Sequence, residues 1–271
     1  MGTVKRERQR EGRQVRLAAA QAEQQRRQRI RTIRNFGIIV VVIIVALFVL
    51  SRLNSDDNKQ TASTSSGGPT ACPAADGSAP RTIDFSSAPP NCIDPAKSYT
   101  ATFDTTAGIV DVKLDTTNTP STANNFVVLS RYHYYDNTTL FRTAQSIGIV
   151  QGGSPHTNSA NDPGPGYQLA DEGYDYASLS QGPSGVTGGP YTYAAGDLVM
   201  ARSASPNGGS AQFFFGVNDN VKNLDAQGTY VNFGSATQGL DVLQKILASG
   251  PEGEGSPSPP VTINKVTITE S

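Results

Sequence analysis

Residues 140–153 read LFRTAQSIGIVQGG, and residues 209–217 read GSAQFFFGV. Side chains two apart in a β-strand lie on one face, so each stretch places apolar groups and a side-chain amide on one surface. The members of this surface are Ile147, Ile149 and Gln151 in the first stretch and Gln212 and Phe214 in the second. Arg142 lies close by and keeps its charge at any physiological pH. The two stretches predict an apolar pocket beside a fixed guanidinium.

A simpler interpretation of the same residues stays open at this point. Ile149 and Phe214 could belong to the core of a β domain, with Arg142 as an ordinary surface residue.

The rest of residues 97–270 also has the pattern of a mainly β domain. Residues 99–115 alternate apolar and polar side chains on both sides of a TTAG turn, which predicts a β-hairpin, and residues 261–270 alternate again. Two helices are expected, at 119–131 and at 237–247. Thr119 suits the N-cap of the first helix, and Pro120 suits its first position. Closure of such a sheet into a barrel would remove its edges.

The N-terminal part of the chain differs sharply in charge. Residues 1–34 hold eleven Lys/Arg and three Glu, a net +8, whereas the whole chain of 271 residues has a net charge of −1. Residues 36–50, FGIIVVVIIVALFVL, contain no polar side chain. Together they predict a basic cytoplasmic tail at 1–34 and a single transmembrane anchor at 35–53, with the C-terminal domain on the extracytoplasmic side. The tail then lies near anionic lipid, and nucleic-acid binding is not expected.

A cleaved signal peptide is the alternative to the anchor. It would need a short basic region and a small-residue cleavage site directly after the apolar run. Here the basic region is long, and SRLNSDDN follows at 51–58. We therefore expect an uncleaved anchor in the cell membrane.

Between the anchor and the β domain lie two further segments. Residues 54–71 are rich in Ser, Thr and Gly and read as a flexible linker, and residues 72–95 read as a Pro-rich collar. Cys72 and Cys92 are the only two cysteines of the chain. In an exported segment such a pair most often forms a disulfide, and two free thiols are the alternative.

Several kinds of site are not predicted. Neither His133 nor His156 has metal-ligand spacing, and we expect both to be surface or loop residues. The glycine-rich stretch around Ser184 lacks the features of a nucleophile elbow or a phosphate loop. Asp171 and Glu172 are adjacent and would point to opposite faces of a strand, which suits a loop anchor better than an acid/base pair. We expect no metal, nucleotide or other cofactor.

The order of several phrases along the chain resembles the cyclophilin family of peptidyl-prolyl cis–trans isomerases. The phrases are NNFVVLSRYHYYDNTTLFR, GIVQGGSP, GPGYQLADE, GDLVMARSASPNGGSAQFFFGV and LDAQGTYVNFGSATQGLDVLQKI, within about 97–270. The resemblance implies a mainly β fold for residues 96–271, a closed eight-stranded antiparallel barrel with two capping helices. With the anchor, it implies a membrane-anchored bacterial form.

The resemblance also implies a function for the arginine. Rotation about the bond before proline needs no nucleophile, metal or cofactor, but it benefits from an apolar pocket for the ring and a donor facing the proline nitrogen. The catalytic residues implied are Arg142 and Gln151. Those implied to bind substrate are Ile147, Ile149, Ala201, Arg202, Gln212, Phe214, Leu224 and Tyr230. The implied substrates are proline-containing segments of unfolded or exported proteins, bound by a monomeric barrel.

Some residues depart from the family pattern. An aromatic residue is usual where Ile147 or Gly148 stands, and one extra residue separates Arg142 from Gln151. Arg202 occupies a position where asparagine is common, and Asn223 one where an aromatic residue occurs in some relatives. LDAQGTYVNFG is about two residues longer than usual. These departures predict a shallower pocket and slower turnover.

Three functions therefore compete. The chain is expected to be an isomerase that assists the folding of exported proteins. The departures from the family pattern favour a non-catalytic module that binds proline peptides at the cell surface. A structural surface protein that keeps only the barrel would do neither.

Overall fold

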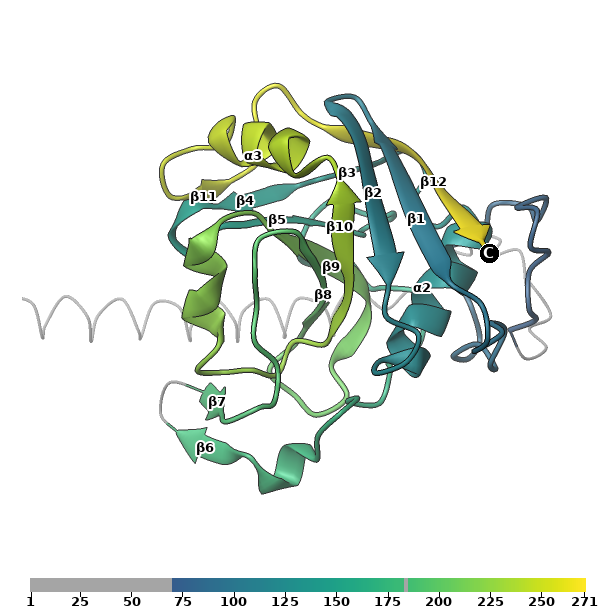
Figure 1. Cartoon of the computed structure of the whole chain (residues 1–271), viewed down its shortest axis with the longest axis horizontal. Helices are drawn as coiled ribbons and strands as arrows, with labels where there is room; N and C mark the ends of the chain where they lie inside the picture. Colours follow the sequence, from purple (N-terminus) through teal and green to yellow (C-terminus); the bar gives the residue numbers. More distant parts are fainter. Residues whose placement is uncertain (1–69, 183–184) are drawn as a thin grey trace, which may run out of the picture. The chain divides into compact units, whose positions relative to one another are not determined.

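The computed structural model describes residues 70–182 and 185–271, which form a curled β-sheet with two α-helices packed on it (Figure 1). Three predicted segments lie outside these residues, namely the tail at 1–34, the anchor at 35–53 and all but the last two residues of the linker at 54–71. In the described part of the chain, no helix has the length and apolarity needed to cross a bilayer.

Ten of the described strands form one antiparallel sheet in the order β11-β4-β5-β9-β8-β10-β2-β1-β12-β3. Their bounds are β1 Tyr99–Thr105, β2 Gly108–Leu114, β3 Thr138–Thr139, β4 Arg142–Ala144, β5 Ile149–Gly152, β8 Asp197–Arg202, β9 Gly209–Gly216, β10 Asn232–Gln238, β11 Glu254–Gly255 and β12 Thr262–Glu270. The strands β6 Ser180–Gly182 and β7 Gly185–Thr187 form a separate pair. Three short 3₁₀ helices, η1 Gln145–Ile147, η2 Tyr176–Ser178 and η3 Asp219–Leu224, lie in connections.

The predicted closed barrel of eight strands is wrong in strand number and in closure. The hydrogen-bonded order of the described strands has two ends, β11 and β3. Residues 138–144 explain this, because β3 pairs with β12 at one end of the sheet while β4, two residues further on, pairs with β5 and β11 at the other. The chain between β3 and β4 thus connects the two ends of the sheet covalently, where a closed barrel would have a continuous ladder of hydrogen bonds.

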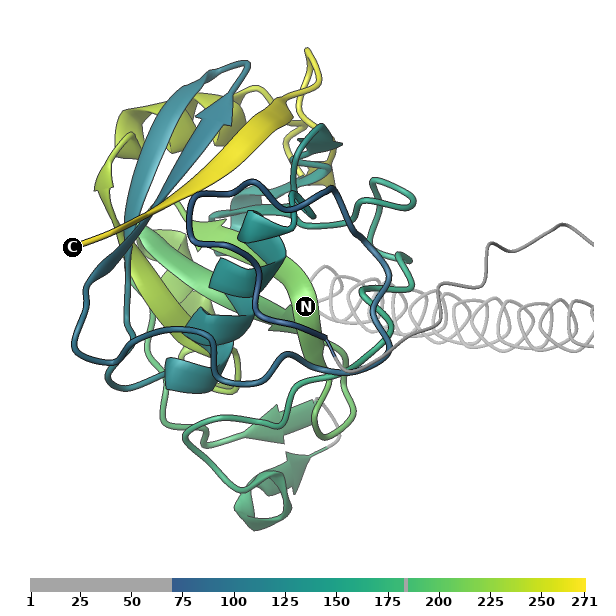
Figure 2. The ribbon, with the colours of Figure 1, turned by 90° about the vertical axis from the view of Figure 1, so that its right-hand side faces the viewer.

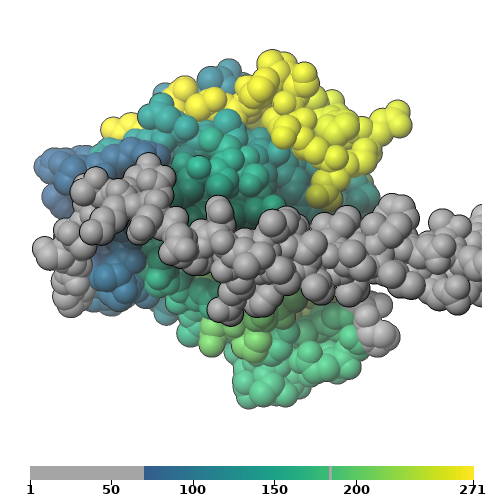
Figure 3. Space-filling view, turned by 180° about the vertical axis from the view of Figure 1, so that it is seen from behind, coloured from purple at the N-terminus to yellow at the C-terminus, as the bar shows by residue number. Residues whose placement is uncertain are grey.

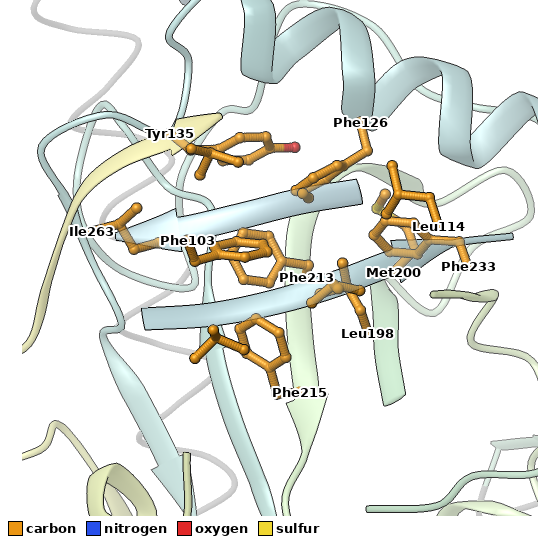
Figure 4. Close-up of a cluster of buried hydrophobic side chains, with 14 of the residues drawn as sticks. Phe103, Leu114, Phe126, Tyr135, Leu198, Met200, Phe213, Phe215, Phe233 and Ile263 are labelled. Atoms are coloured by element: carbon orange, nitrogen blue, oxygen red, sulfur yellow. The ribbon is translucent and has the colours of Figure 1, made fainter. Parts of the chain in front are cut away.

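The predicted hairpin is present as β1 and β2. Buried and more exposed side chains alternate along both strands, because one face of the sheet packs on the core. Tyr99, Ala101 and Phe103 are buried, and the ring of Phe103 lies 5.5 Å from that of Phe213 and 5.1 Å from that of Phe215. Figure 4 shows these rings inside the curl, with Phe126 of the first helix beside them. Aromatic rings in such edge-on contacts bury large apolar areas, so this cluster is the main core.

The helix α2, Pro120–Arg131, begins where the sequence predicts, but its cap has another source. Thr119 is the N-cap without a capping side-chain bond, since its hydroxyl donates to the Asp115 carbonyl. The Glu172 carboxylate accepts instead from the backbone N–H groups of Ser121 and Thr122, at 2.8 and 2.9 Å. A carboxylate at this end also complements the helix dipole. Glu172 therefore anchors its loop, as expected, and it does so by capping α2.

The helix α3, Leu240–Ala248, is shorter than the predicted range of 237–247 at its start. Thr237 and Gln238 still belong to β10, and Gly239 makes the change of direction with φ of 85°. This left-handed conformation and the close approach of the Ile109 carbonyl require glycine. Leu243, Ile246 and Leu247 are buried, and Figure 1 shows α3 lying across one end of the sheet.

The collar at 72–95 contains no regular helix or strand and is fastened to α2. Cys72 and Cys92 form a disulfide with an Sγ–Sγ distance of 2.12 Å. Asn124 of α2 donates to the Pro90 carbonyl at 2.9 Å and accepts from the Cys92 N–H at 2.7 Å. Figure 2 shows the dark-blue collar passing across α2 on the side away from the sheet. For this reason α2 is buried on nearly all sides and not only on the predicted apolar face.

Candidate active site

One row of side chains crosses four neighbouring strands of the sheet. Arg142 of β4 pairs with Gln151 of β5, Gln151 pairs with Phe214 of β9, and Phe214 pairs with Val199 of β8. Residues directly opposite each other in antiparallel strands project to the same face. The neighbours of Phe214 in β9, Phe213 and Phe215, project to the other face and enter the core (Figure 4). The row therefore lies on the face of the sheet opposite the core.

An apolar cluster occupies this face, separate from the main core. We define the apolar socket as the buried side chains of Ile149, Val199 and Phe214 together with the partly buried Ala201, Leu224 and Tyr230. The rings of Phe214 and Tyr230 meet edge to face, with centroids 5.5 Å apart. Such a cluster of apolar walls with a ring at one side suits a small apolar group such as a proline ring.

A chain of polar side chains runs along one side of the socket. Arg142 Nη1 donates to Gln151 Oε1 at 2.6 Å, and Gln151 Nε2 donates to Gln212 Oε1 at 3.0 Å. Gln212 Nε2 donates in turn to the Ala160 carbonyl at 3.2 Å. Each amide is thereby held in one orientation, and one edge of the guanidinium is bonded to Gln151. The arginine is part of the row and not an isolated surface charge.

A carboxylate that sequence reasoning did not single out completes the arrangement around Arg142. Arg142 Nε donates to Glu254 Oε1 at 2.7 Å, and Arg142 Nη2 donates to Glu254 Oε2 at 2.9 Å. The guanidinium lowers the pKa of the Glu254 carboxyl below its usual value of 4.5. Glu254 lies 112 residues from Arg142 in the chain and reaches it because β11 pairs with β4. In the view from behind, yellow and teal surfaces of these two parts of the chain adjoin (Figure 3).

Comparisons with known proteins address the family directly. The family model described as cyclophilin type peptidyl-prolyl cis-trans isomerase/CLD matches residues 100–268, more than half of the chain. The chain belongs to the cyclophilin family.

Curated relatives agree with this assignment. The probable peptidyl-prolyl cis-trans isomerase B of Mycobacterium tuberculosis (strain H37Rv) is 34% identical over 179 residues, which are 65% of this chain and 54% of the relative. The chain thus spans about half the length of the mycobacterial relatives that it matches. The peptidyl-prolyl cis-trans isomerase B of Escherichia coli (strain K12) is 29% identical, with 62% of this chain and 99% of the relative covered.

Solved structures share the cyclophilin fold. A cyclophilin type isomerase of Cryptosporidium parvum matches with a TM-score of 0.51 and 24% identity, over 64% of this chain and 98% of its own. The same protein in the presence of the dipeptide Ala-Pro matches with a TM-score of 0.50 and 25% identity, over 63% and 98%.

Arg142 and Gln151 are in direct register in the ladder of β4 and β5. The connection from β4 to β5 runs through η1, and Ala144 faces Ile149 directly across it. Gly148 closes this turn with φ of 58°, and a side chain there would collide with Asn218. An aromatic residue could not replace Gly148 without strain. Ile147 instead packs, partly buried, against the cluster that forms the socket.

Asn223 connects the two 3₁₀ helices η1 and η3. Its side chain donates to the Ser146 carbonyl at 3.0 Å, and Asn220 donates to the Gln145 carbonyl at 2.9 Å. These bonds hold η3 against η1, so that Leu224 at the end of η3 packs against the socket cluster. The loop after Leu224 folds back on it, because the Gly228 N–H donates to the Leu224 carbonyl.

Arg202 is the predicted site residue that the structure does not bring into the socket. Its side chain is 4% exposed, Nη2 donates to the Ser205 carbonyl at 2.7 Å, and the guanidinium lies 5.0 Å from the Tyr176 ring centroid. Asp171 stands 3.5 Å away. The guanidinium is used within the protein, whereas Ala201, one residue earlier, packs on the socket. A binding role for Arg202 through its backbone stays a prediction.

Two hollows of the described surface are not lined by Arg142, Gln151 or Phe214. One of about 390 Å³ lies beside Tyr230 and Arg202. A larger one of about 780 Å³ is lined by residues such as Lys97, Asp115 and Tyr191 and by none of the predicted site residues. Its size alone does not make it the site, because it lacks the row of Arg142, Gln151 and Phe214.

The two histidines are held in loops by carboxylates. His133 bonds Asp136 at 2.8 Å, and His156 bonds Asp162 and Asp84 at 3.1 and 3.0 Å. Neither bonds to a residue of the row or the socket. Among the described residues, no cluster of three or more His, Cys, Asp or Glu could hold a metal ion.

Proposed function

We propose that the chain is a peptidyl-prolyl cis–trans isomerase whose active site is the apolar socket with Arg142. A peptide bond before proline has partial double-bond character and a barrier to rotation of roughly 20 kcal/mol. As the bond twists, the lone pair of the proline nitrogen localises and becomes able to accept a hydrogen bond. A donor placed there stabilises the twisted state more than the planar states, which lowers the barrier.

The single observation that carries the proposal is the row of Arg142, Gln151 and Phe214 across β4, β5 and β9. It places a permanent donor beside apolar walls on one face of the sheet. An arginine cannot lose its proton at physiological pH, so the donor is always available. Membership of the cyclophilin family supports the same activity, and the fold neighbour from Cryptosporidium parvum was studied with Ala-Pro.

The substrates that we propose are proline-containing segments of unfolded or exported proteins. We assign the proline ring to the apolar socket, and selectivity for the residues that flank the proline then depends on backbone contacts. The amides of Gln151 and Gln212 and the strand around Ala201 are the groups that we assign to those contacts. We propose a monomer that works without a metal or an organic cofactor.

We further propose a tethered, extracytoplasmic form of this isomerase in a bacterial membrane. The apolar run at 36–50 and the net charge of +8 over 1–34 support an anchor at 35–53 with a cytoplasmic N-terminus. The linker at 54–71 and the collar at 72–95 would then connect the anchor to the catalytic domain at 96–271. Protease digestion of intact cells tests this, because an extracytoplasmic domain is released from the cell whereas a cytoplasmic one is protected.

The test of activity is the exchange rate between cis and trans forms of an Ala-Pro peptide, measured by NMR with the full chain in detergent. Arg142→Ala should lower kcat/KM by roughly 10²- to 10³-fold, the usual effect of removing one donor to developing charge. Lys265→Ala serves as the control. It also removes a positive charge, but on β12, which lies toward the other end of the strand order from β4. Equal rates for wild type and Arg142→Ala would refute the assignment.

A non-catalytic proline-peptide module is the second candidate. The observation that favours it is the engagement of Arg142 by Glu254, because a guanidinium occupied by a carboxylate has fewer free donors. Saturable peptide binding without any acceleration of exchange would support this candidate over the enzyme.

A further inference from the structure

The guanidinium of Arg142 has five N–H donors, and three of them are used within the protein. Nε and Nη2 each donate to Glu254, and Nη1 donates to Gln151. Two N–H groups, one on Nη1 and one on Nη2, therefore have no partner among these contacts. The bidentate pair with Glu254 sets the plane of the guanidinium, and this plane decides where the two remaining N–H groups point.

The carboxylate of Glu254 is delivered by a backbone that is firmly attached to β4. Gly255 faces Thr143 in the ladder, and the Thr143 hydroxyl also donates to the Gly255 carbonyl at 2.8 Å. The Ser256 hydroxyl donates to the Phe141 carbonyl at 2.8 Å, and the Gln145 N–H to the Gly253 carbonyl at 3.1 Å. Bonds on both sides of Glu254 therefore fix its backbone relative to Arg142.

The pair of Arg142 and Glu254 lies in contact with solvent. The Glu254 side chain is 59% exposed and that of Arg142 is 27% exposed. Exposed ion pairs typically stabilise a fold only slightly, because solvent screens them and two long side chains lose freedom. The two-bond geometry nevertheless fixes the orientation of the guanidinium, whatever the pair adds to stability.

We propose that Glu254 is a positioning residue for Arg142, which holds the guanidinium in the orientation that the rotating amide requires. The inference rests on the proposed isomerase function. Without Glu254, the long side chain of Arg142 keeps only the bond to Gln151 and can turn about its remaining torsions. The donor must then be ordered anew in each catalytic event, and the cost of ordering one flexible side chain corresponds to roughly a twofold to tenfold slower reaction.

The experiment compares the full chain in detergent as wild type, Glu254→Ala and Glu252→Ala. Glu252 is an exposed carboxylate two residues away in the same loop and makes no contact with Arg142, which makes it a matched control. NMR exchange with an Ala-Pro peptide gives kcat and KM. The ¹⁵N relaxation of the Arg142 Nε–Hε group reports the mobility of the guanidinium, which a merely structural role would leave unchanged.

The expected result for Glu254→Ala is a kcat lower by roughly twofold to tenfold, an unchanged KM and increased Nε–Hε mobility. Glu252→Ala should match wild type in all three. An unchanged kcat, or an Nε–Hε group as rigid as in wild type, overturns the proposal. A rise in KM at constant kcat also overturns it, because Glu254 would then act on substrate binding.

A second pair of variants separates this proposal from the function on which it rests. In an Arg142→Lys background the two-bond pair cannot form, since lysine lacks the planar fork. Glu254→Ala should then change kcat by less than twofold, and a further fivefold loss would show that Glu254 acts independently of Arg142 and would overturn the proposal. If Arg142→Ala itself leaves the wild-type rate intact, the isomerase assignment fails. If Arg142→Ala is inactive while Glu254→Ala is fully active, only the positioning role fails.

Discussion

Arg142 and Gln151 face each other across β4 and β5, and Arg142 Nη1 donates to Gln151 Oε1 at 2.6 Å. They are nine residues apart in the chain, yet the turn through η1 brings them into direct register. Gln151 Nε2 in turn donates to Gln212 Oε1 at 3.0 Å. The donor of the proposed reaction is thus connected to β5 and β9, two of the strands that carry the socket.

Gln151 should therefore matter through its amide. In Gln151→Leu the acceptor for Arg142 and the donor to Gln212 are both lost at nearly constant volume. We expect kcat/KM for an Ala-Pro peptide to fall roughly tenfold. The melting temperature should stay close to wild type, because leucine fills nearly the same volume as the buried glutamine. Gln181→Leu, on β6 outside this row, is the control. Full activity of Gln151→Leu would show that the amide chain has no part in the reaction.

Phe214 and Phe215 are adjacent in β9 but serve different faces of the sheet. Phe214 lies in the socket, whereas Phe215 lies in the main core. We expect Phe214→Leu to lower kcat/KM by more than its loss of stability explains. Phe215→Leu should lose about 1 kcal/mol or more of stability while each folded molecule keeps normal activity. Urea unfolding and exchange rates on the same samples decide the matter. Parallel losses of activity and stability in both variants would place Phe214 in the core.

The disulfide between Cys72 and Cys92 should stabilise the folded domain through the collar. Thiol labelling of the denatured, unreduced chain should find no free thiol, and two reactive thiols would contradict the bond. Closing a loop of this length contributes roughly 3 kcal/mol in the chain-entropy description. We expect reduction to lower the melting temperature by several degrees. The Cys72→Ser/Cys92→Ser double variant should melt where the reduced wild type does, and reducing agent should not change it further.

His156 should make stability depend on pH. Partial burial lowers the pKa of His156, but the hydrogen bonds to Asp162 and Asp84 and their negative charges outweigh it, and the net pKa is raised above 6.5. A raised pKa in the folded state contributes stability that is fully present below about pH 6.5 and is lost as the pH rises through the raised value. The melting temperature of wild type should therefore fall across this range.

The control for this prediction is His156→Gln, which should show a smaller fall over the same pH range. Asp84→Asn should bring the imidazole pKa, measured by NMR titration, back toward 6.5, because Asp84 supplies one of the two bonds. A His156 pKa at or below 6.5 in wild type would refute the assignment of this pH dependence.

Much of the local structure follows from the sequence by itself. Alternation over 99–115 and 261–270 predicts β1, β2 and β12, because side chains two apart share a face whatever the rest of the fold does. The same rule places Gln151 with Ile149 and Phe214 opposite Phe213. Pro120 marks the start of α2 because its fixed φ suits the first turn. These features depend only on neighbouring residues. The order of the motifs along the chain indicated the family.

Tertiary structure alone decided the features that join distant parts of the chain. Glu254 belongs to a Gly- and Pro-rich stretch of sequence with no distinguishing pattern, and only the pairing of β11 with β4 brings it to Arg142. Likewise Glu172 caps α2 from a loop, and Arg202 turns to Ser205 and Tyr176. The open order of the sheet also depends on how residues 138–144 divide between two edges. Such contacts arise from the path of the whole chain, which local spacing does not encode.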